Sequence, residues 1–151
     1  MISYLREGTK FHFRKRRICT NWIKSVIHDE SRISNKEKDD CKETTGDISV
    51  VFCSDEYLLE INKKFLSHDY LTDVITFDYS TEKIISGDIF ISIDTVRANS
   101  EFYKQDFSKE LNRVIIHGVL HLIGYKDKTK TQKQFMREKE DFYLNKKELN
   151  D

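Results

Sequence analysis

This 151-residue sequence has no long hydrophobic run, no net charge and no paired cysteines, and each absence excludes a class of protein. The apolar runs fall well short of the roughly 20 residues that a membrane-spanning helix needs, so we expect no transmembrane segment. The 26 basic and 26 acidic side chains balance. Bulk charge therefore does not require a nucleic-acid partner, although a local basic patch can still bind one.

The three cysteines, Cys19, Cys41 and Cys53, are odd in number and show no CxxC spacing, so we expect no disulfide framework. Cys19 and Cys53 stand inside apolar patterns, which predicts small buried side chains in a reducing compartment. Because the N-terminus is charged and no membrane span is expected, the protein is predicted to be cytoplasmic. Repeats and low-complexity tracts are also lacking, and the length fits one domain over residues 1–151.

Short strands and helices alternate along the chain. Four apolar segments predict strands, within residues 2–13, 47–54, 72–80 and 86–93. Apolar residues recurring every three to four positions predict five helices, at about residues 14–29, 55–65, 94–103, 108–123 and 131–147. Residues 34–47, in which Cys41 is the one apolar member, predict a solvated loop. The order predicts an α+β fold, with a small mixed sheet packed with about five helices.

Polar residues before three of these helices predict their N-caps, which are Ser54, Asp94 and Ser108. Periodicity also predicts which side chains each helix buries. The helix after Ser54 is expected to turn inward Leu58, Leu59, Ile61, Asn62 and Phe65. The last helix is expected to turn inward Phe135, Met136, Phe142 and Tyr143.

Two of the five histidines, His117 and His121, lie in the almost wholly apolar run of residues 114–123. Residues four apart lie about 40° apart around a helix, so both rings project from one face. A single histidine on an apolar face is more often a core side chain with one hydrogen-bond partner. Two such rings need partners where few polar groups exist, and the pair therefore favours a metal site.

Asp127 completes the predicted set of ligands. Gly124 is expected to end the helix, because glycine adopts the left-handed conformation without strain. The chain then reverses, so Asp127 can face the two rings in the pattern H-x3-H-x2-G-x2-D. Three protein ligands with a fourth position left to water are typical of catalytic zinc. We expect one divalent metal ion on His117, His121 and Asp127, with zinc as the first candidate and other transition metals as alternatives.

The stretch HGVLHLIGYKD, residues 117–127, resembles HGxLHLxGYDH, the signature of the YbeY endoribonucleases. TDVITFDYS and SGDIFISI resemble that family's TDVLSF and LGDI segments, so the resemblance covers about half of the chain, residues 50–127. It implies a zincin-like metal site and a metal-dependent endoribonuclease specific for single-stranded RNA. It further implies a role in maturing the 3′ end of 16S rRNA and in ribosome quality control, with the ribosome or its small subunit as partner.

Two positions depart from the family pattern. Asp127 stands at the spacing of the family's third histidine, and its negative charge makes a bound metal a weaker Lewis acid. Leu66 stands where the family usually has an arginine that meets a phosphate. Four nearby cations are candidates to replace that charge, although such residues are more often solvated: Lys63, Lys64, His68 and Arg97.

Other residues are candidates for supporting roles. His117 and His121 are expected to be catalytic through the metal, and Asp88 is a further catalytic candidate because it could orient water or a ligand histidine. Asp78 is a candidate for the same role, and strand-end turn chemistry explains both aspartates equally well. The attacking group is water or the ribose 2′-hydroxyl, and the sequence does not separate the two.

The basic cluster Arg14, Lys15, Arg16 and Arg17 lies at the start of the first predicted helix, beside Phe11, His12 and Phe13. Basic side chains neutralise phosphates, and aromatic rings stack on bases. Four positive charges at a helix N-terminus also oppose the helix dipole, which is unfavourable without a partner. These observations favour an RNA contact over a merely solvated helix start.

Two alternative functions stay open. The ligand spacing is also that of metzincin metalloproteases, but those enzymes need a glutamate directly after the first histidine, where this chain has Gly118. The second alternative is a non-catalytic ribosome-associated protein whose metal only stabilises the C-terminal turn. The leucine at position 66 keeps that alternative open.

Overall fold

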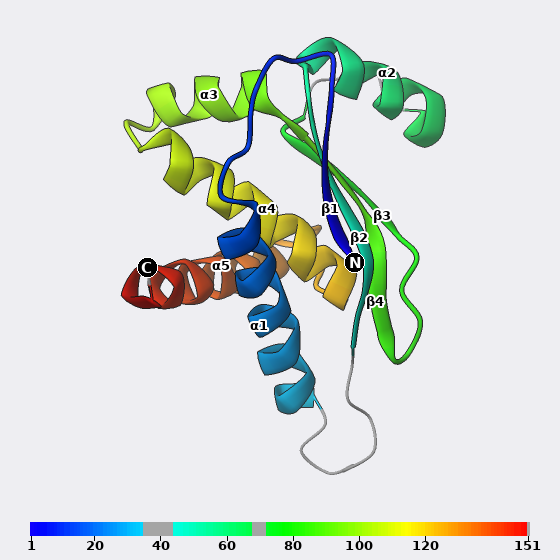
Figure 1. Ribbon diagram of the computed structural model, residues 1–151, viewed down its shortest axis with the longest axis vertical. Helices are drawn as coiled ribbons and strands as arrows, with labels where there is room; N and C mark the ends of the chain where they lie inside the picture. Colours follow the sequence, from blue (N-terminus) through cyan, green and yellow to red (C-terminus); the bar gives the residue numbers. More distant parts are fainter. Residues whose placement is uncertain (35–43, 68–71, 151) are drawn as a thin grey trace.

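The computed structural model describes residues 1–34, 44–67 and 72–150, with side chains up to Lys147. The strands are β1 (Ile2–Glu7), β2 (Thr44–Cys53), β3 (Val74–Asp78) and β4 (Ile84–Ser92). The helices are α1 (Arg16–Ser34), α2 (Asp55–Leu66), α3 (Ile93–Phe102), α4 (Phe107–Ile123) and α5 (Lys130–Asn150). The predicted α+β fold, with a small mixed sheet and five helices, is confirmed over these described residues (Figure 1).

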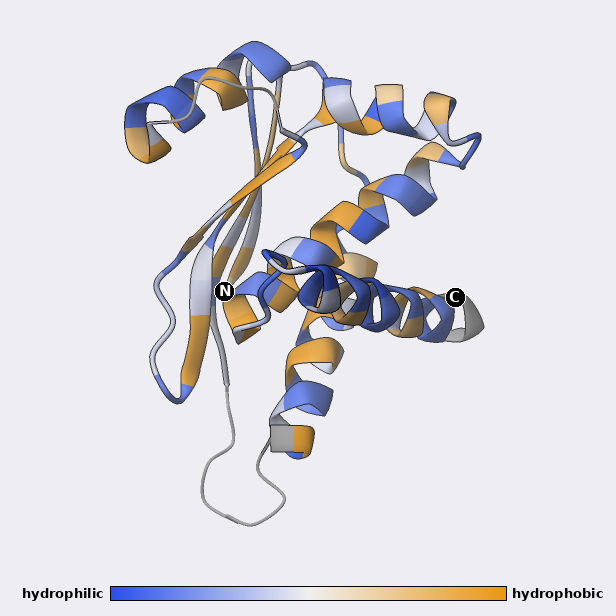
Figure 2. Cartoon of the chain, turned by 180° about the vertical axis from the view of Figure 1, so that it is seen from behind, coloured by the Kyte–Doolittle hydropathy of each residue, from blue (hydrophilic) through white to orange (hydrophobic). Residues whose placement is uncertain are grey.

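The sheet has the strand order β1-β2-β4-β3. β1, β2 and β4 run parallel, and β3 pairs antiparallel with β4 at one edge. α1 and α4 pack on one face of the sheet, with α5 against α4, while α2 packs against the other face. In Figure 2 the central strands are hydrophobic over much of their length, whereas α5 is predominantly hydrophilic. The large core therefore lies between the sheet and the layer formed by α1 and α4.

Close packing of α4 on the sheet depends on two glycines. A Cβ at Gly118 would lie 2.6 Å from the Cγ2 atom of Ile89 in β4. A Cβ at Gly87 would lie 2.3 Å from the carbonyl oxygen of Phe77 and 2.6 Å from Cδ2 of Leu122. A side chain at either position would push the helix and the strand apart. These glycines thus determine how closely α4 approaches the sheet.

Several strand boundaries differ from the predictions. β1 ends at Glu7, and the rings of Phe11 and Phe13 pack on Phe52 instead of continuing the strand. β2 already begins at Thr44, so the predicted loop is wrong for residues 44–47, and Ser34 belongs to α1. The remainder of that loop, residues 35–43 with Cys41, lies outside the described residues.

Two of the three predicted N-caps are wrong. Ser54 caps α2 as predicted, since its hydroxyl accepts a hydrogen bond from the Tyr57 amide at 3.2 Å. Ser92 caps α3, whereas Asp94 lies in the first turn of that helix and accepts from the Asp55 amide at 2.9 Å. Asp106, rather than Ser108, precedes α4. In both cases the helix begins earlier than the apolar period indicated.

Burial confirms four of the predicted inward side chains, leaves Leu59 and Ile61 partly buried, and contradicts the prediction for three aromatic ones. Met136, Tyr143, Leu58 and Asn62 are buried, and Cys19 and Cys53 are buried free thiols. Phe65, Phe135 and Phe142 are 56 %, 47 % and 56 % exposed, so their predicted inward orientation is wrong. Each helix buries a narrow stripe, and these rings lie beside it. None of the described helices is both long enough and apolar enough to cross a bilayer.

We predict that Gly118→Ala lowers the free energy of unfolding by about 1–3 kcal/mol, because the new methyl group overpacks the contact with Ile89. Thermal or urea unfolding measures this change. In an Ile89→Ala background the contact is relieved, and the same substitution should stabilise by about 1 kcal/mol through helix propensity. An equal loss in both backgrounds would contradict the packing described for Gly118.

Candidate metal centre

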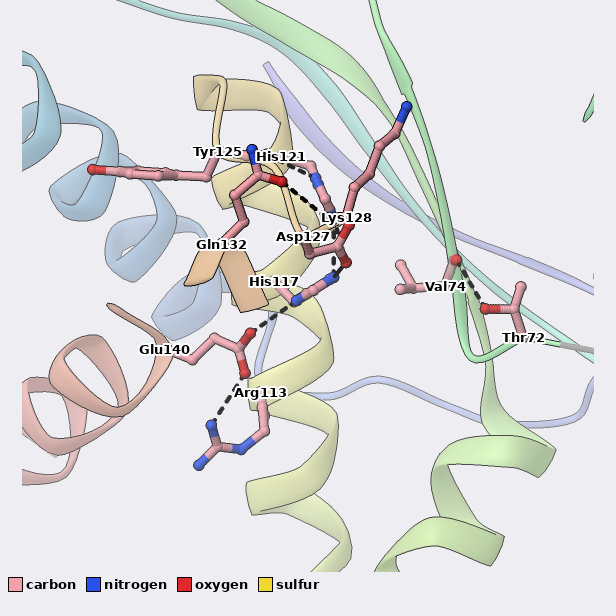
Figure 3. A network of polar contacts seen from close by, with 10 residues as sticks. All are labelled: Thr72, Val74, Arg113, His117, His121, Tyr125, Asp127, Lys128, Gln132 and Glu140. Atoms are coloured by element: carbon pink, nitrogen blue, oxygen red, sulfur yellow. Dashed lines mark hydrogen bonds and ion pairs between the residues drawn. The ribbon is translucent and has the colours of Figure 1, made fainter. Parts of the chain in front are cut away.

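The structure brings the three predicted ligands together. His117 and His121 project from the same face of α4, and their Nε2 atoms lie 3.0 Å apart. The Oδ2 atom of Asp127 lies 3.2 Å from the first Nε2 and 3.3 Å from the second. Donor atoms of a tetrahedral site with bonds of 2.0–2.1 Å lie about 3.3 Å apart. The near-equilateral triangle of two nitrogens and one oxygen therefore fits a small divalent cation (Figure 3).

Hydrogen bonds orient both rings for that role. His117 Nδ1 lies 2.8 Å from Oε2 of Glu140, and His121 Nδ1 lies 2.9 Å from the backbone oxygen of Tyr125. Both partners are acceptors, so each Nδ1 carries the proton and donates it. Each Nε2 then presents its lone pair to the centre of the triangle, which is the tautomer that a metal ligand requires.

A short turn between α4 and α5 carries Asp127 back to the rings. Gly124 ends α4 with φ +121°, which confirms the predicted glycine stop. At the start of α5, Thr129 Oγ1 accepts from the Gln132 amide at 3.1 Å. Gln132 Oε1 accepts in return from the Lys128 and Thr129 amides, each at 3.1 Å. This capping box fixes the chain just after Asp127.

Anionic side chains surround the two rings. Burial acts to lower the pKa of His117, but the hydrogen bond and charge of Glu140, with the charges of Asp127 and Asp73, raise it overall. Burial raises the pKa of the Asp73 carboxyl, and the nearby His117 opposes that shift. Arg113 Nη1 donates to Glu140 Oε1 at 3.1 Å and so partly balances the charge. The remaining negative charge favours a cation at the rings.

Two cavities meet at the ligands. A cavity of about 820 Å³ is lined by His117 and Asp127 together with residues of α3, α4 and α5. A second cavity, of about 420 Å³, is lined by all three ligands and by residues of α2 and β3. Because Asp127 is 39 % exposed and each histidine more than 20 %, the donor atoms are reachable from solvent.

The comparisons with known proteins agree with this geometry. The sequence model of the family described as Endoribonuclease YbeY matches residues 8–148. The chain belongs to this family. Proteins named Endoribonuclease YbeY from Flavobacterium psychrophilum and Karelsulcia muelleri are 48 % and 46 % identical to it, over 93 % and 95 % of this chain and 92 % and 94 % of their own. A solution structure from Thermotoga maritima has a TM-score of 0.58 at 28 % identity, covering 97 % of this chain and 89 % of that one.

Leu66 stands where the YbeY family usually has an arginine. It lines the smaller cavity together with both histidines. The three candidate cations that the structure describes do not take the place of the missing arginine. Lys64 lies over the ring of Phe65, and Arg97 lies over the ring of Phe107. Lys63 lines neither cavity, and His68 is outside the described residues.

Asp88 is not brought to the ligands. Along β4 the buried side chains Ile85, Gly87, Ile89 and Ile91 face α4, so Asp88 points to the opposite face of the sheet. Asp78 shares the face of α4, but its carboxylate accepts from the Ser80 amide at 2.9 Å, which is turn chemistry at the strand end. We therefore assign neither residue a role in the centre.

The basic cluster Arg14–Arg17 is exposed and lines neither of the cavities at the ligands. Stacking of bases on the neighbouring Phe11 and Phe13 stays a prediction, and both rings are partly buried. Their ring centroids lie 5.3 and 5.0 Å from that of Phe52, so these rings pack against the core. Lys15 lines a separate cavity with Trp22 and Lys147.

Sequence reasoning missed Glu140, which is 5 % exposed and holds His117. A signal was present, because Glu140 lies four residues after Met136 and three before Tyr143 on the buried stripe of α5. A carboxylate at such a position needs a partner. Asp73 was missed as well, although it lies in the quoted TDV segment and lines both cavities.

We predict that Asp127→Ala lowers the metal content of the purified protein, because one of three donors is lost. Lys126→Ala is the matched control, since that neighbouring side chain is exposed and outside the triangle. Elemental analysis after dialysis against a fixed free-metal concentration measures both variants. Full occupancy in Asp127→Ala would remove that residue from the ligand set.

Proposed function

We propose that this protein is a metal-dependent endoribonuclease that cleaves single-stranded RNA and acts in rRNA processing. The observation that carries the proposal is the triangle of donor atoms from His117, His121 and Asp127 at the meeting point of two cavities. Relatives that share more than 40 % of its sequence over most of their length bear the name Endoribonuclease YbeY, which supports the same activity here.

Each residue of the centre has a distinct part in the proposed reaction. A divalent ion on the three ligands would polarise a phosphoryl oxygen of the RNA and lower the barrier to attack by water or a 2′-hydroxyl. Glu140 keeps the proton on Nδ1 of His117, so the ring stays in its ligand tautomer. Asp73 lines both cavities, which puts a carboxylate beside the ligands where it can accept a proton from the attacking group.

We place the RNA strand in the larger cavity. Its lining includes four basic side chains, Lys109, Arg113, Lys133 and Arg137. Arg113 is engaged by Glu140 and by Asp141, whose Oδ1 lies 2.7 Å from Nη2. Lys133 and Arg137 are exposed and lie one turn apart on α5, so both can meet phosphates of one strand.

Finer features of the function follow as parts of the same proposal. Two imidazole nitrogens and one carboxylate oxygen suit zinc, which we propose as the metal. We further propose the 3′ end of 16S rRNA as the target, a role in ribosome quality control, and the small ribosomal subunit as partner. This work would take place in the cytoplasm.

The two alternatives have weaker support. A glutamate at position 118 would be needed for a metalloprotease, but that site is packed against Ile89 and admits no larger side chain without a shift. A purely structural metal would not need donor atoms open to two cavities. A cleavage experiment therefore distinguishes the proposed enzyme from the non-catalytic alternative.

Cleavage of a labelled single-stranded RNA is the direct test of the proposed activity. Protein reconstituted separately with zinc, manganese or nickel should cut the RNA with at least one metal, and an equally folded His121→Ala protein should fall to background. Duplex RNA of the same sequence should be spared. Equal cleavage by the variant would indicate a contaminant, and no cleavage with any metal would support the non-catalytic alternative.

The salt dependence of RNA binding separates two basic surfaces. If Lys133 and Arg137 each contact a phosphate, replacing both by alanine should flatten the slope of log K against log salt by about 1.4. The Arg16→Ala, Arg17→Ala protein tests the predicted contact of the cluster Arg14–Arg17 in the same way. An unchanged slope in either double variant would show that the two replaced residues do not contact phosphates.

A further inference from the structure

Glu30 is a buried carboxylate that none of the catalytic roles above uses. It lies near the end of α1 and is 3 % exposed. Its Oε2 accepts from the Tyr125 hydroxyl at 2.6 Å, while its Oε1 accepts from the Tyr143 hydroxyl and from Lys139 Nζ, the latter at 3.0 Å. A carboxylate at this depth is costly unless such donors meet it.

The donors come from two different parts of the chain. Tyr143 and Lys139 both belong to α5, so their bonds join α1 to α5. Tyr125 instead lies in the turn that follows α4, two residues before the ligand Asp127. The ammonium group of Lys139 also lies 5.8 Å from the centroid of the Tyr125 ring. One carboxylate therefore ties the ligand-bearing turn to the helical layer behind it.

The backbone of Tyr125 connects this residue to the metal centre. Its backbone oxygen accepts the Nδ1 proton of His121, and its backbone amide donates to the Leu120 oxygen at 3.0 Å. In Figure 3 the side chain of Tyr125 points away from His121, whereas its backbone lies beside that ring. The residue thus contacts Glu30 with its hydroxyl and a metal ligand with its carbonyl.

We propose that Glu30 is a positioning residue of the metal centre: by holding the Tyr125 hydroxyl it fixes the carbonyl that orients His121 and the turn that carries Asp127. The inference rests on the proposed function, because it assumes that these ligands bind a metal. Glu140, on α5, orients the other histidine, His117, through a direct hydrogen bond.

The matched pair of variants is Tyr125→Phe and Tyr143→Phe. Each removes one hydroxyl bonded to the same carboxylate, and only the first lies in the ligand-bearing turn. Partners that orient metal ligands are typically worth 10–100-fold in metal affinity. We expect Tyr125→Phe to weaken zinc binding by about tenfold. Tyr143→Phe should lower the unfolding temperature without changing that affinity.

Competition with a chromophoric chelator measures the zinc affinity of each protein, and thermal unfolding of the metal-free proteins measures stability. Equal affinity of Tyr125→Phe and wild type would overturn the inference and leave the proposed function standing. An equal loss of affinity in both variants would also overturn it, since the effect would then be general stability. If the wild type binds no divalent metal, the proposed function and the inference fail together.

A second measurement does not depend on bound metal. Exchange of the imidazole Nδ1 protons with water can be followed by NMR in the metal-free protein. In Tyr125→Phe the His121 proton should exchange faster, because its acceptor carbonyl is less firmly held, while the His117 proton on Glu140 should be unaffected. Unchanged exchange at His121 would overturn the inference.

Discussion

Close packing of α4 against β4 is the constraint on which the rest of the structure depends. Gly118 faces Ile89, and Gly87 leaves room for Leu122, so the helix lies directly on the sheet. His117 immediately precedes Gly118, which places its ring at the side of the contact, next to β3 and its cavity. A bulkier residue at either glycine would lift the ligands away from Asp73 and Leu66. The packing of α4 on the sheet therefore explains both why this helix is mostly apolar and where its two histidine rings lie.

What the sequence predicted well is what lies close together along the chain. His117, His121, Gly124 and Asp127 fall within eleven residues, and helix geometry with one glycine-dependent turn determines how they meet. The YbeY-family motif covers the same stretch. Glu140 contacts His117 from α5, and Glu30 contacts Tyr125 from α1, so the spacing of the ligands contains no information on either. Only their position on buried stripes signalled that partners must exist.

The errors in the prediction have a common origin in tertiary structure. Asp88 stands beside a glycine at a strand, as an orienting carboxylate would, but strand alternation relative to α4 turns it to the other face. Phe11 and Phe13 were expected to meet bases, and the structure shows both rings partly buried against Phe52. Which face or neighbour a residue meets is decided by the packing of whole elements. That packing cannot be deduced from a local pattern.

The network around Glu30 has a consequence for protein synthesis. Glu30 is made early, whereas its partner Tyr143 follows 113 residues later, near the end of the chain. Before α5 is made, the carboxylate lacks two of its donors, Tyr143 and Lys139, so its burial is costly at that stage. All four described strands and the three ligands precede α5 in the chain, so they can be made before this network is complete. Full burial of Glu30 therefore has to wait for α5.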